Sequence, residues 1–180
     1  MIKFAALSHA NPIIDVGPHP NGPELWDAIL AELPAGAIIA GGAVRDYLLG
    51  VEPKDIDVFI AANKFMNPAG FHELGEDKDA EYGAMSEICV VTRGVVADRQ
   101  VDLVGVDYAN VSDMIERFDF GVARCWYDGE LHDTPEAAAD RANKTVTLFH
   151  RDRLERSRAR FARFNERMGG DWRLIDDVQV

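Results

Sequence analysis

The fold is decided by one stretch of sequence, which reads Gly41-Gly42-Ala43-Val44-Arg45-Asp46-Tyr47-Leu48-Leu49-Gly50 and resumes five residues later as Asp55-Ile56-Asp57-Val58. The apolar run 37–40 before it is typical of a buried strand. Residues 43–49 are typical of a helix that ends at Gly50, since glycine commonly follows the last helical residue. The glycine pair therefore lies where a strand passes into a helix. Backbone N–H groups and the helix dipole favour bound phosphate at such a junction, and Arg45 adds a fixed positive charge nearby.

Asp55 and Asp57 stand two residues apart at the start of an apolar strand that runs to Ile60. Side chains two apart in a strand share a face, so the two carboxylates point the same way and repel each other. A divalent cation removes that repulsion, and Mg²⁺ prefers one or two carboxylates together with phosphate oxygens. The plainer interpretation of an isolated Asp-x-Asp is a turn cap after Pro53 and a solvated second carboxylate. The nearby glycine pair favours the metal site.

Segment 38–60 resembles the head of the class II nucleotidyltransferases, the bacterial poly(A) polymerases and CCA-adding tRNA nucleotidyltransferases of the polymerase-β-like superfamily. The likeness rests on Gly-Gly-x-Val-Arg-Asp-x-Leu-Leu-Gly at 41–50 and on Pro-Lys-Asp-Ile-Asp at 53–57. It implies an α/β (α+β) fold, in which a mixed sheet packs against helices. In this chain the head would be followed by a C-terminal arginine-rich helix.

The resemblance also implies roles for individual residues. Asp55 and Asp57 would be catalytic carboxylates that hold two Mg²⁺ ions, while Gly41, Gly42 and Arg45 would border the triphosphate of a bound NTP. The family adds a third carboxylate from a neighbouring strand.

Asp102 is the candidate for that third carboxylate. It lies in the apolar strand expected over Arg99–Val106. An acid between two apolar residues is also what an outward-facing position of an alternating strand requires. Both interpretations, metal ligand and solvated strand residue, stay open.

Residues 116–129 resemble the family's Arg-Arg-Asp-Phe-Thr-Ile-Asn-Ala block, with Arg117 at the first arginine. The family's second Arg, its Thr and its Asn are replaced by Phe118, Gly121 and Ala123. Those polar positions help to seat the nucleotide in the family, so the departures imply a changed nucleotide geometry. Arg124 follows Arg117 by seven residues, a spacing that places both on one face of a helix. We expect both arginines to bind the nucleotide.

The C-terminal segment 151–173 holds eight arginines, and Arg160-Phe161-Ala162-Arg163-Phe164 resembles the family's Arg-Phe-Ala-Ala-Arg-Phe helix. The segment 152–156 does not match the Glu-Asp-x-x-Arg motif with which the family reads the base. Helical spacing predicts one apolar face, made by Leu154, Phe161, Phe164 and Met168.

The arginines would then be largely exposed, and they form the strongest candidate for a phosphate-backbone surface. The predicted RNA contacts are Arg156, Arg160 and Arg163. A soluble helix with i,i+4 charge pairs is the alternative interpretation.

Composition favours one compact domain, because 180 residues with 47% hydrophobic content suffice for a sizeable core. We expect a head domain over 1–150, with the basic helix and tail of 151–180 packed on it. The net charge of -12 disfavours a general nucleic-acid binder, although 151–180 carries eight basic against six acidic residues. Neither Cys89 nor Cys125 belongs to a Cys-x-x-Cys site, and no signal peptide or membrane anchor opens the chain. We expect a cytoplasmic protein without a membrane partner, and leave its oligomeric state open.

These observations predict a metal-dependent nucleotidyltransferase that transfers an NMP from an NTP to an acceptor hydroxyl. The favoured acceptor is an RNA or tRNA 3′ end. We expect no counterpart of the family's body and tail domains in this chain, so the resemblance leaves the base and the acceptor open. One alternative is a toxin-type enzyme that nucleotidylates tRNA or protein. Another is a non-catalytic nucleotide- or RNA-binding descendant of the fold, which the altered block at 116–129 favours.

Overall fold

The computed structural model describes residues 21–75, 87–149 and 154–176. In these ranges a seven-stranded mixed sheet has the order β3-β4-β5-β2-β1-β6-β7. Its strands are β1 (Ile38–Ala40), β2 (Ile56–Ala61), β3 (His72–Glu73), β4 (Ile88–Val96), β5 (Arg99–Val106), β6 (Cys125–Tyr127) and β7 (Leu131–Asp133). The α-helices are α1 (Pro23–Ala31), α2 (Gly42–Leu48), α4 (Pro135–Asn143) and α5 (Leu154–Arg167). Short 3₁₀ turns are η1 (Ala62–Lys64), η2 (Val111–Arg117) and η3 (Gly121–Ala123), and β8 (Thr145–Thr147) pairs with β9 (Arg173–Ile175).

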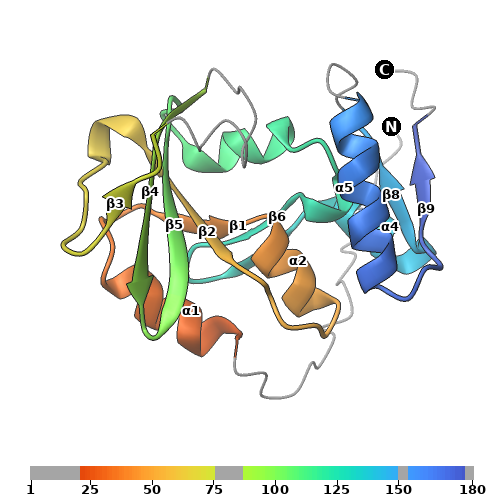
Figure 1. The fold of residues 1–180 in the computed structure, drawn as a ribbon, viewed down its shortest axis with the longest axis horizontal. Helices are drawn as coiled ribbons and strands as arrows, with labels where there is room; N and C mark the ends of the chain where they lie inside the picture. Colours follow the sequence, from red (N-terminus) through yellow and green to blue (C-terminus); the bar gives the residue numbers. More distant parts are fainter. Residues whose placement is uncertain (1–20, 76–86, 150–153, 177–180) are drawn as a thin grey trace, which may run out of the picture.

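The centre of the sheet is the parallel pair β2 and β5, while every other neighbouring pair in this sheet is antiparallel. Alternating residues of β2 enter two different cores. Val58 packs in the cluster that contains Trp26 of α1 and Val44 of α2. Phe59 packs in the cluster that contains Met114 of η2. Helices α1 and α2 therefore cover one face of the sheet and η2 the other, as Figure 1 shows.

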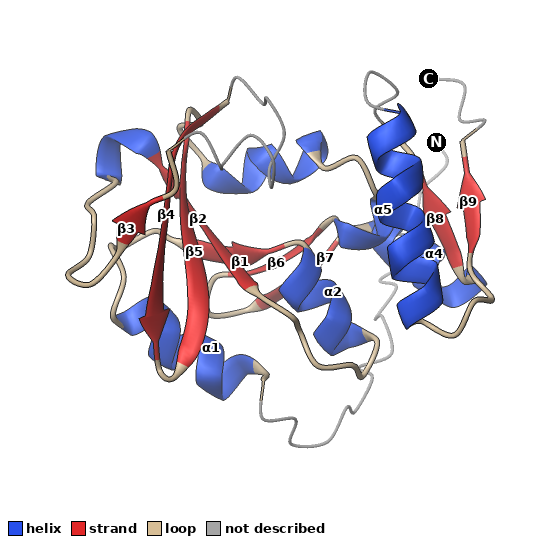
Figure 2. Ribbon diagram, viewed as in Figure 1, coloured by secondary structure: helices blue, strands red, loops and turns tan. Residues whose placement is uncertain are grey.

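The C-terminal part forms a second layer beside the sheet (Figure 2). Its strands β8 and β9 pair in parallel, and helix α5 connects them in the sequence. Phe164 of α5 is buried against Phe120 and Trp172. Leu154, Phe161 and Met168 pack partly buried against the same cluster. The predicted apolar face of this helix is confirmed.

One expectation about a helix is wrong. Arg117 and Arg124 do not share a helix face, because η2 ends at Arg117 and Phe118 is extended at φ -66° and ψ 130° before η3 begins. The arginine-rich helix α5 ends at Arg167; Gly169 and Gly170 follow with φ values of +92° and +84°, and Arg173 begins β9.

The arginines at 151 and 153 lie outside the described residues. Within the described ranges, the helices are too short or too polar to cross a membrane.

Candidate functional site

A cleft of about 650 Å³ lies between the sheet, the start of α2, the segment around η2 and helix α5. Ten of the eleven predicted site residues line it, and only Arg124 does not. These ten are Gly41, Gly42, Arg45, Asp55, Asp57, Asp102, Arg117, Arg156, Arg160 and Arg163. Segments more than 100 residues apart in the sequence thus meet around one space.

The sheet wall of the cleft carries three carboxylates. Asp55 is exposed just before β2, Asp57 is half-buried on β2, and Asp102 is buried opposite Asp57 on the parallel strand β5. Arg93 of β4 donates to both oxygens of Asp102, from Nε to Oδ1 and from Nη2 to Oδ2, each at 2.7 Å. The charge of Asp102 is therefore balanced within the protein, whereas Asp55 faces the cleft and solvent.

The glycine pair forms the sharp turn from β1 into α2. Gly41 has φ +74° and ψ -121°, a conformation that L-residues with a side chain rarely adopt. Its N–H donates to the Cys125 carbonyl at 3.0 Å, so this amide closes the junction rather than facing a ligand. A Cβ at Gly41 would lie 3.1 Å from the Phe118 ring. The N–H groups of the first turn of α2, beginning with Gly42, have no acceptor inside the helix.

Arg45 and Asp46 link α2 to α5. The Arg45 guanidinium donates to Asp46 Oδ1, at 2.8 Å from Nε and 2.7 Å from Nη2, and lies 4.8 Å from the Phe164 ring centre. Asp46 is almost fully buried, and its second oxygen accepts a hydrogen bond from Arg167 of α5. Asp46 and Arg167 both line the cleft, and sequence reasoning assigned a role to neither. The Arg45-Asp46 pair within the motif at 41–50 is the sequence feature that could have indicated Asp46.

The block after η2 supplies the next part of the wall. Arg117 pairs with Glu87 at 3.0 Å, and Asp119 accepts hydrogen bonds from Ser157 Oγ at 2.9 Å and from Arg160 Nη1 at 3.0 Å. Phe118 stands where the class II nucleotidyltransferase block has its second arginine. Its ring packs 5.7 Å from that of Phe59, and both line the cleft. The substitution replaces a charge by an apolar surface.

Arg124 points elsewhere. Its Nη2 donates to the carbonyls of Glu116 at 2.6 Å and Phe118 at 3.1 Å, and its guanidinium stacks 3.7 Å from the Phe149 ring centre. Burial lowers the pKa of this arginine from its ordinary value. The contacts give Arg124 a structural role in holding the chain around Phe118, outside the cleft.

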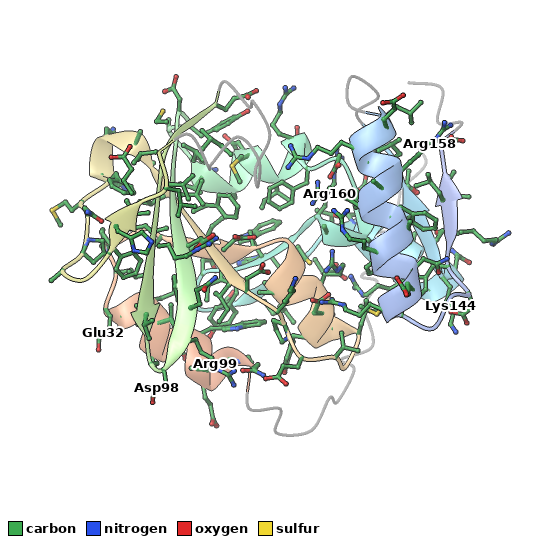
Figure 3. The ribbon with its side chains drawn as sticks, in the orientation of Figure 1. Glu32, Asp98, Arg99, Lys144, Arg158 and Arg160 are labelled. Carbon is green, nitrogen blue, oxygen red and sulfur yellow. The ribbon has the colours of Figure 1, made fainter. Side chains whose placement is uncertain are left out.

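Four arginines of α5 form the opposite wall, at helical spacing on one face: Arg156, Arg160, Arg163 and Arg167. Arg158 lies on the other side of the helix and pairs with Asp176 at 3.0 Å, and Figure 3 shows Arg158 and Arg160 on opposite sides. The arginine face is therefore no separate surface. It faces the same cleft as Asp55 and Asp57.

The donor set can be compared with what Mg²⁺ requires. The described ranges contain no preassembled group of three or more His, Cys, Asp or Glu side chains around a metal position. Asp55 and Asp57 offer carboxylate oxygens to the cleft, while Asp102 is held by Arg93. Two carboxylates fit Mg²⁺, which completes its shell with phosphate oxygens and water.

Most of the sequence matches one protein family. The sequence model of the family described as 'Gabija anti-defense 2 family protein' matches residues 21–160. The chain belongs to this Gabija anti-defense 2 family. The matched range includes the glycine pair, all three carboxylates and the block around Phe118.

Solved structures show the fold. A CCA-adding enzyme in complex with CTP matches with a TM-score of 0.53 and 18% identity, over 78% of this chain and 36% of that one. The Thermotoga maritima CCA-adding enzyme complexed with tRNA matches with a TM-score of 0.52 and 17% identity, over 85% and 38%. A tRNA-processing enzyme in an apo form matches at 0.52 and 21%, over 77% and 41%.

The predicted nucleotidyltransferase-head fold is therefore confirmed. The chain spans about two fifths of the length of these structures. No curated protein matches the chain.

Proposed function

We propose that this chain is a metal-dependent nucleotidyltransferase that transfers an NMP from an NTP to an acceptor hydroxyl. The observation that supports it best is the meeting of Asp55 and Asp57 with the glycine turn and Arg45 in one cleft. The carboxylate pair can bind Mg²⁺ that also holds phosphate oxygens. The guanidinium of Arg45 and the backbone N–H groups of the turn can bind the phosphates directly.

Each residue has a defined task in this reaction. Asp55 and Asp57 would hold Mg²⁺, which would neutralise phosphate charge and acidify the attacking hydroxyl. Arg45 and the first-turn N–H groups of α2 would stabilise the negative charge that develops as the hydroxyl attacks the α-phosphate and pyrophosphate leaves. Phe59 and Phe118 give the cleft an apolar side that excludes water from the reacting groups.

The acceptor we favour is an RNA or tRNA 3′ end, because one fold relative is solved with tRNA and others with CTP or ATP. The family's name connects it with countering Gabija defence. We propose that nucleotidyl transfer is the activity by which this chain does so. Transfer to a protein hydroxyl is the alternative acceptor chemistry.

A non-catalytic nucleotide-binding role is the second candidate. Two observations favour it. Both oxygens of Asp102 accept hydrogen bonds from Arg93, and the Phe118 ring stands at the position of the second arginine in the class II nucleotidyltransferase block. Under this role the cleft would bind an NTP without turnover.

The test is transfer of label from α-phosphate-labelled ATP, CTP, GTP and UTP to total tRNA and to total cell protein, with and without Mg²⁺. The Asp55→Asn/Asp57→Asn double variant is the control, and suppression of Gabija defence in cells is measured in parallel. Magnesium-dependent labelling that the variant abolishes, together with loss of anti-defence activity, supports the proposal. NTP binding without transfer to RNA or protein would replace it by the non-catalytic role.

A further inference from the structure

The four cleft-facing arginines of α5 are not equivalent. Arg160 donates to both oxygens of Asp119 at 3.0 Å, and Arg167 donates to Asp46. Both carboxylates belong to the rest of the cleft wall, so these two arginines attach α5 to it. Their positive charge is balanced by the contact that holds the helix.

Arg163 lies between them on the same face, and it differs. It lines the cleft and is exposed, yet no carboxylate in the described part of the chain pairs with it. The helix face on which it lies is fixed by its two neighbours and by Phe164, which is buried in the adjoining core. An arginine presented to a cleft by a helix held in this way is preorganised for an external anion.

Lys54, on the sheet side of the cleft, resembles Arg163 in its exposure and in its missing carboxylate partner among the described residues. It lies next to Asp55 and lines the same cleft. Arg45 and Arg117, by contrast, pair with Asp46 and Glu87. The positive charge that remains for a ligand therefore includes a lysine beside the carboxylate pair and an arginine on α5.

We propose that Arg163 and Lys54 bind the terminal phosphates of a triphosphate, so that α5 is part of the nucleotide site and not an RNA-backbone surface. The inference deepens the proposed nucleotidyl transfer and rests on it for the position of the α-phosphate at Asp55 and Asp57. A triphosphate extends from that point into the cleft, and its terminal phosphates carry most of its charge. An arginine and a lysine without carboxylate partners among the described residues suit that charge, while a duplex or strand backbone needs an open surface along its length.

The test uses calorimetric titration of the full chain with three ligands in the presence of Mg²⁺: inorganic tripolyphosphate, a non-hydrolysable NTP, and a short RNA with a 5′-hydroxyl. The variants are Arg163→Ala, Lys54→Ala and the matched control Arg158→Ala, whose arginine lies on the opposite side of α5 and pairs with Asp176. Thermal unfolding of each variant shows whether the fold is kept.

We expect Arg163→Ala and Lys54→Ala each to weaken tripolyphosphate and NTP binding by about tenfold, with RNA binding and melting temperature unchanged. Arg158→Ala should bind all three ligands as the parent does. Unchanged tripolyphosphate affinity in Arg163→Ala would overturn the inference, as would an effect confined to RNA. Tripolyphosphate binding that depends on Arg163 in a chain that binds no NTP would leave the anion site standing and remove the proposed function instead.

Discussion

The two walls of the cleft are built in different ways. The carboxylates of the sheet wall lie on and beside the hydrogen-bonded strands β2 and β5, which are buried on both faces. The α5 wall is a single helix, attached by one apolar edge and by the ion pairs of Arg160 and Arg167. The carboxylates proposed for the chemistry, with Lys54 beside them, therefore lie on or next to the hydrogen-bonded sheet. Arg163, proposed to bind the terminal phosphates, lies on a helix whose position depends on a few contacts.

The largest expected effect is on the sheet wall. Replacing Asp55 and Asp57 together by asparagine should lower NMP transfer by on the order of a thousandfold or more, because the pair holds the metal. Stability should change little or rise slightly, since two like charges at one site are removed. Single-turnover rates and urea unfolding measure the two effects. If the free energy of unfolding fell by as much as the activation free energy of transfer rose, the pair would be structural.

On the α5 wall the expected effect is on stability. Asp46→Asn should destabilise the protein by about 2 kcal/mol, because the buried carboxylate accepts charged hydrogen bonds from Arg45 and Arg167. The matched control is Asp176→Asn, which removes the exposed pair with Arg158 and should cost within about 0.5 kcal/mol. Denaturant unfolding measures both. Equal costs would show that Asp46 does not hold α5.

The glycine turn between the walls gives a smaller difference. Gly41→Ala should cost about 1–3 kcal/mol, for the strained φ and for the Cβ that would lie 3.1 Å from Phe118. Gly50→Ala is the control, since its φ is +70° but nothing lies within 4 Å of its Cβ position. The difference between the two unfolding free energies measures the Phe118 contact. A larger cost at Gly50 would contradict the packing described here.

The last prediction concerns pH, and its effect appears only above pH 9. Burial raises the pKa of the Cys125 thiol from 9.0 to about 12, and burial with the Asp27 hydrogen bond raises that of Tyr127 to about 12. The folded state therefore keeps these protons at a pH where the unfolded state has lost them, so stability is full below pH 9 and falls from pH 9 to 12. Urea midpoints across that range measure the fall, and Cys125→Ala should reduce it. A midpoint that stays level to pH 12 would contradict the assigned burial.

The sequence predicted the sheet wall well because its signals are local. A strand, a glycine turn and an Asp-x-Asp motif lie within residues 38–60, and the resemblance to a known family covers that segment. The strand around Asp102 was placed at its observed bounds. Its pairing with Arg93 was not foreseen, because cross-strand partners depend on a register that the sequence pattern does not fix.

The α5 wall was predicted less completely. The apolar face of the helix could be found from spacing, but the direction of its arginines depends on which face of the domain the helix covers. That choice is made by distant contacts such as those of Asp46 and Asp119, which no local pattern reveals. Arg124 was misplaced for a related reason: the extended backbone at Phe118 interrupts the helix that the spacing assumed.

The most direct test of the account is a crystal structure of the chain with Mn²⁺ and a non-hydrolysable NTP, in which anomalous scattering locates the metal. We predict Mn²⁺ at Asp55 and Asp57, the α-phosphate beside it, and the terminal phosphates within hydrogen-bond distance of Arg163 and Lys54. Metal bound away from Asp55 and Asp57, or a nucleotide outside the cleft, would contradict the account.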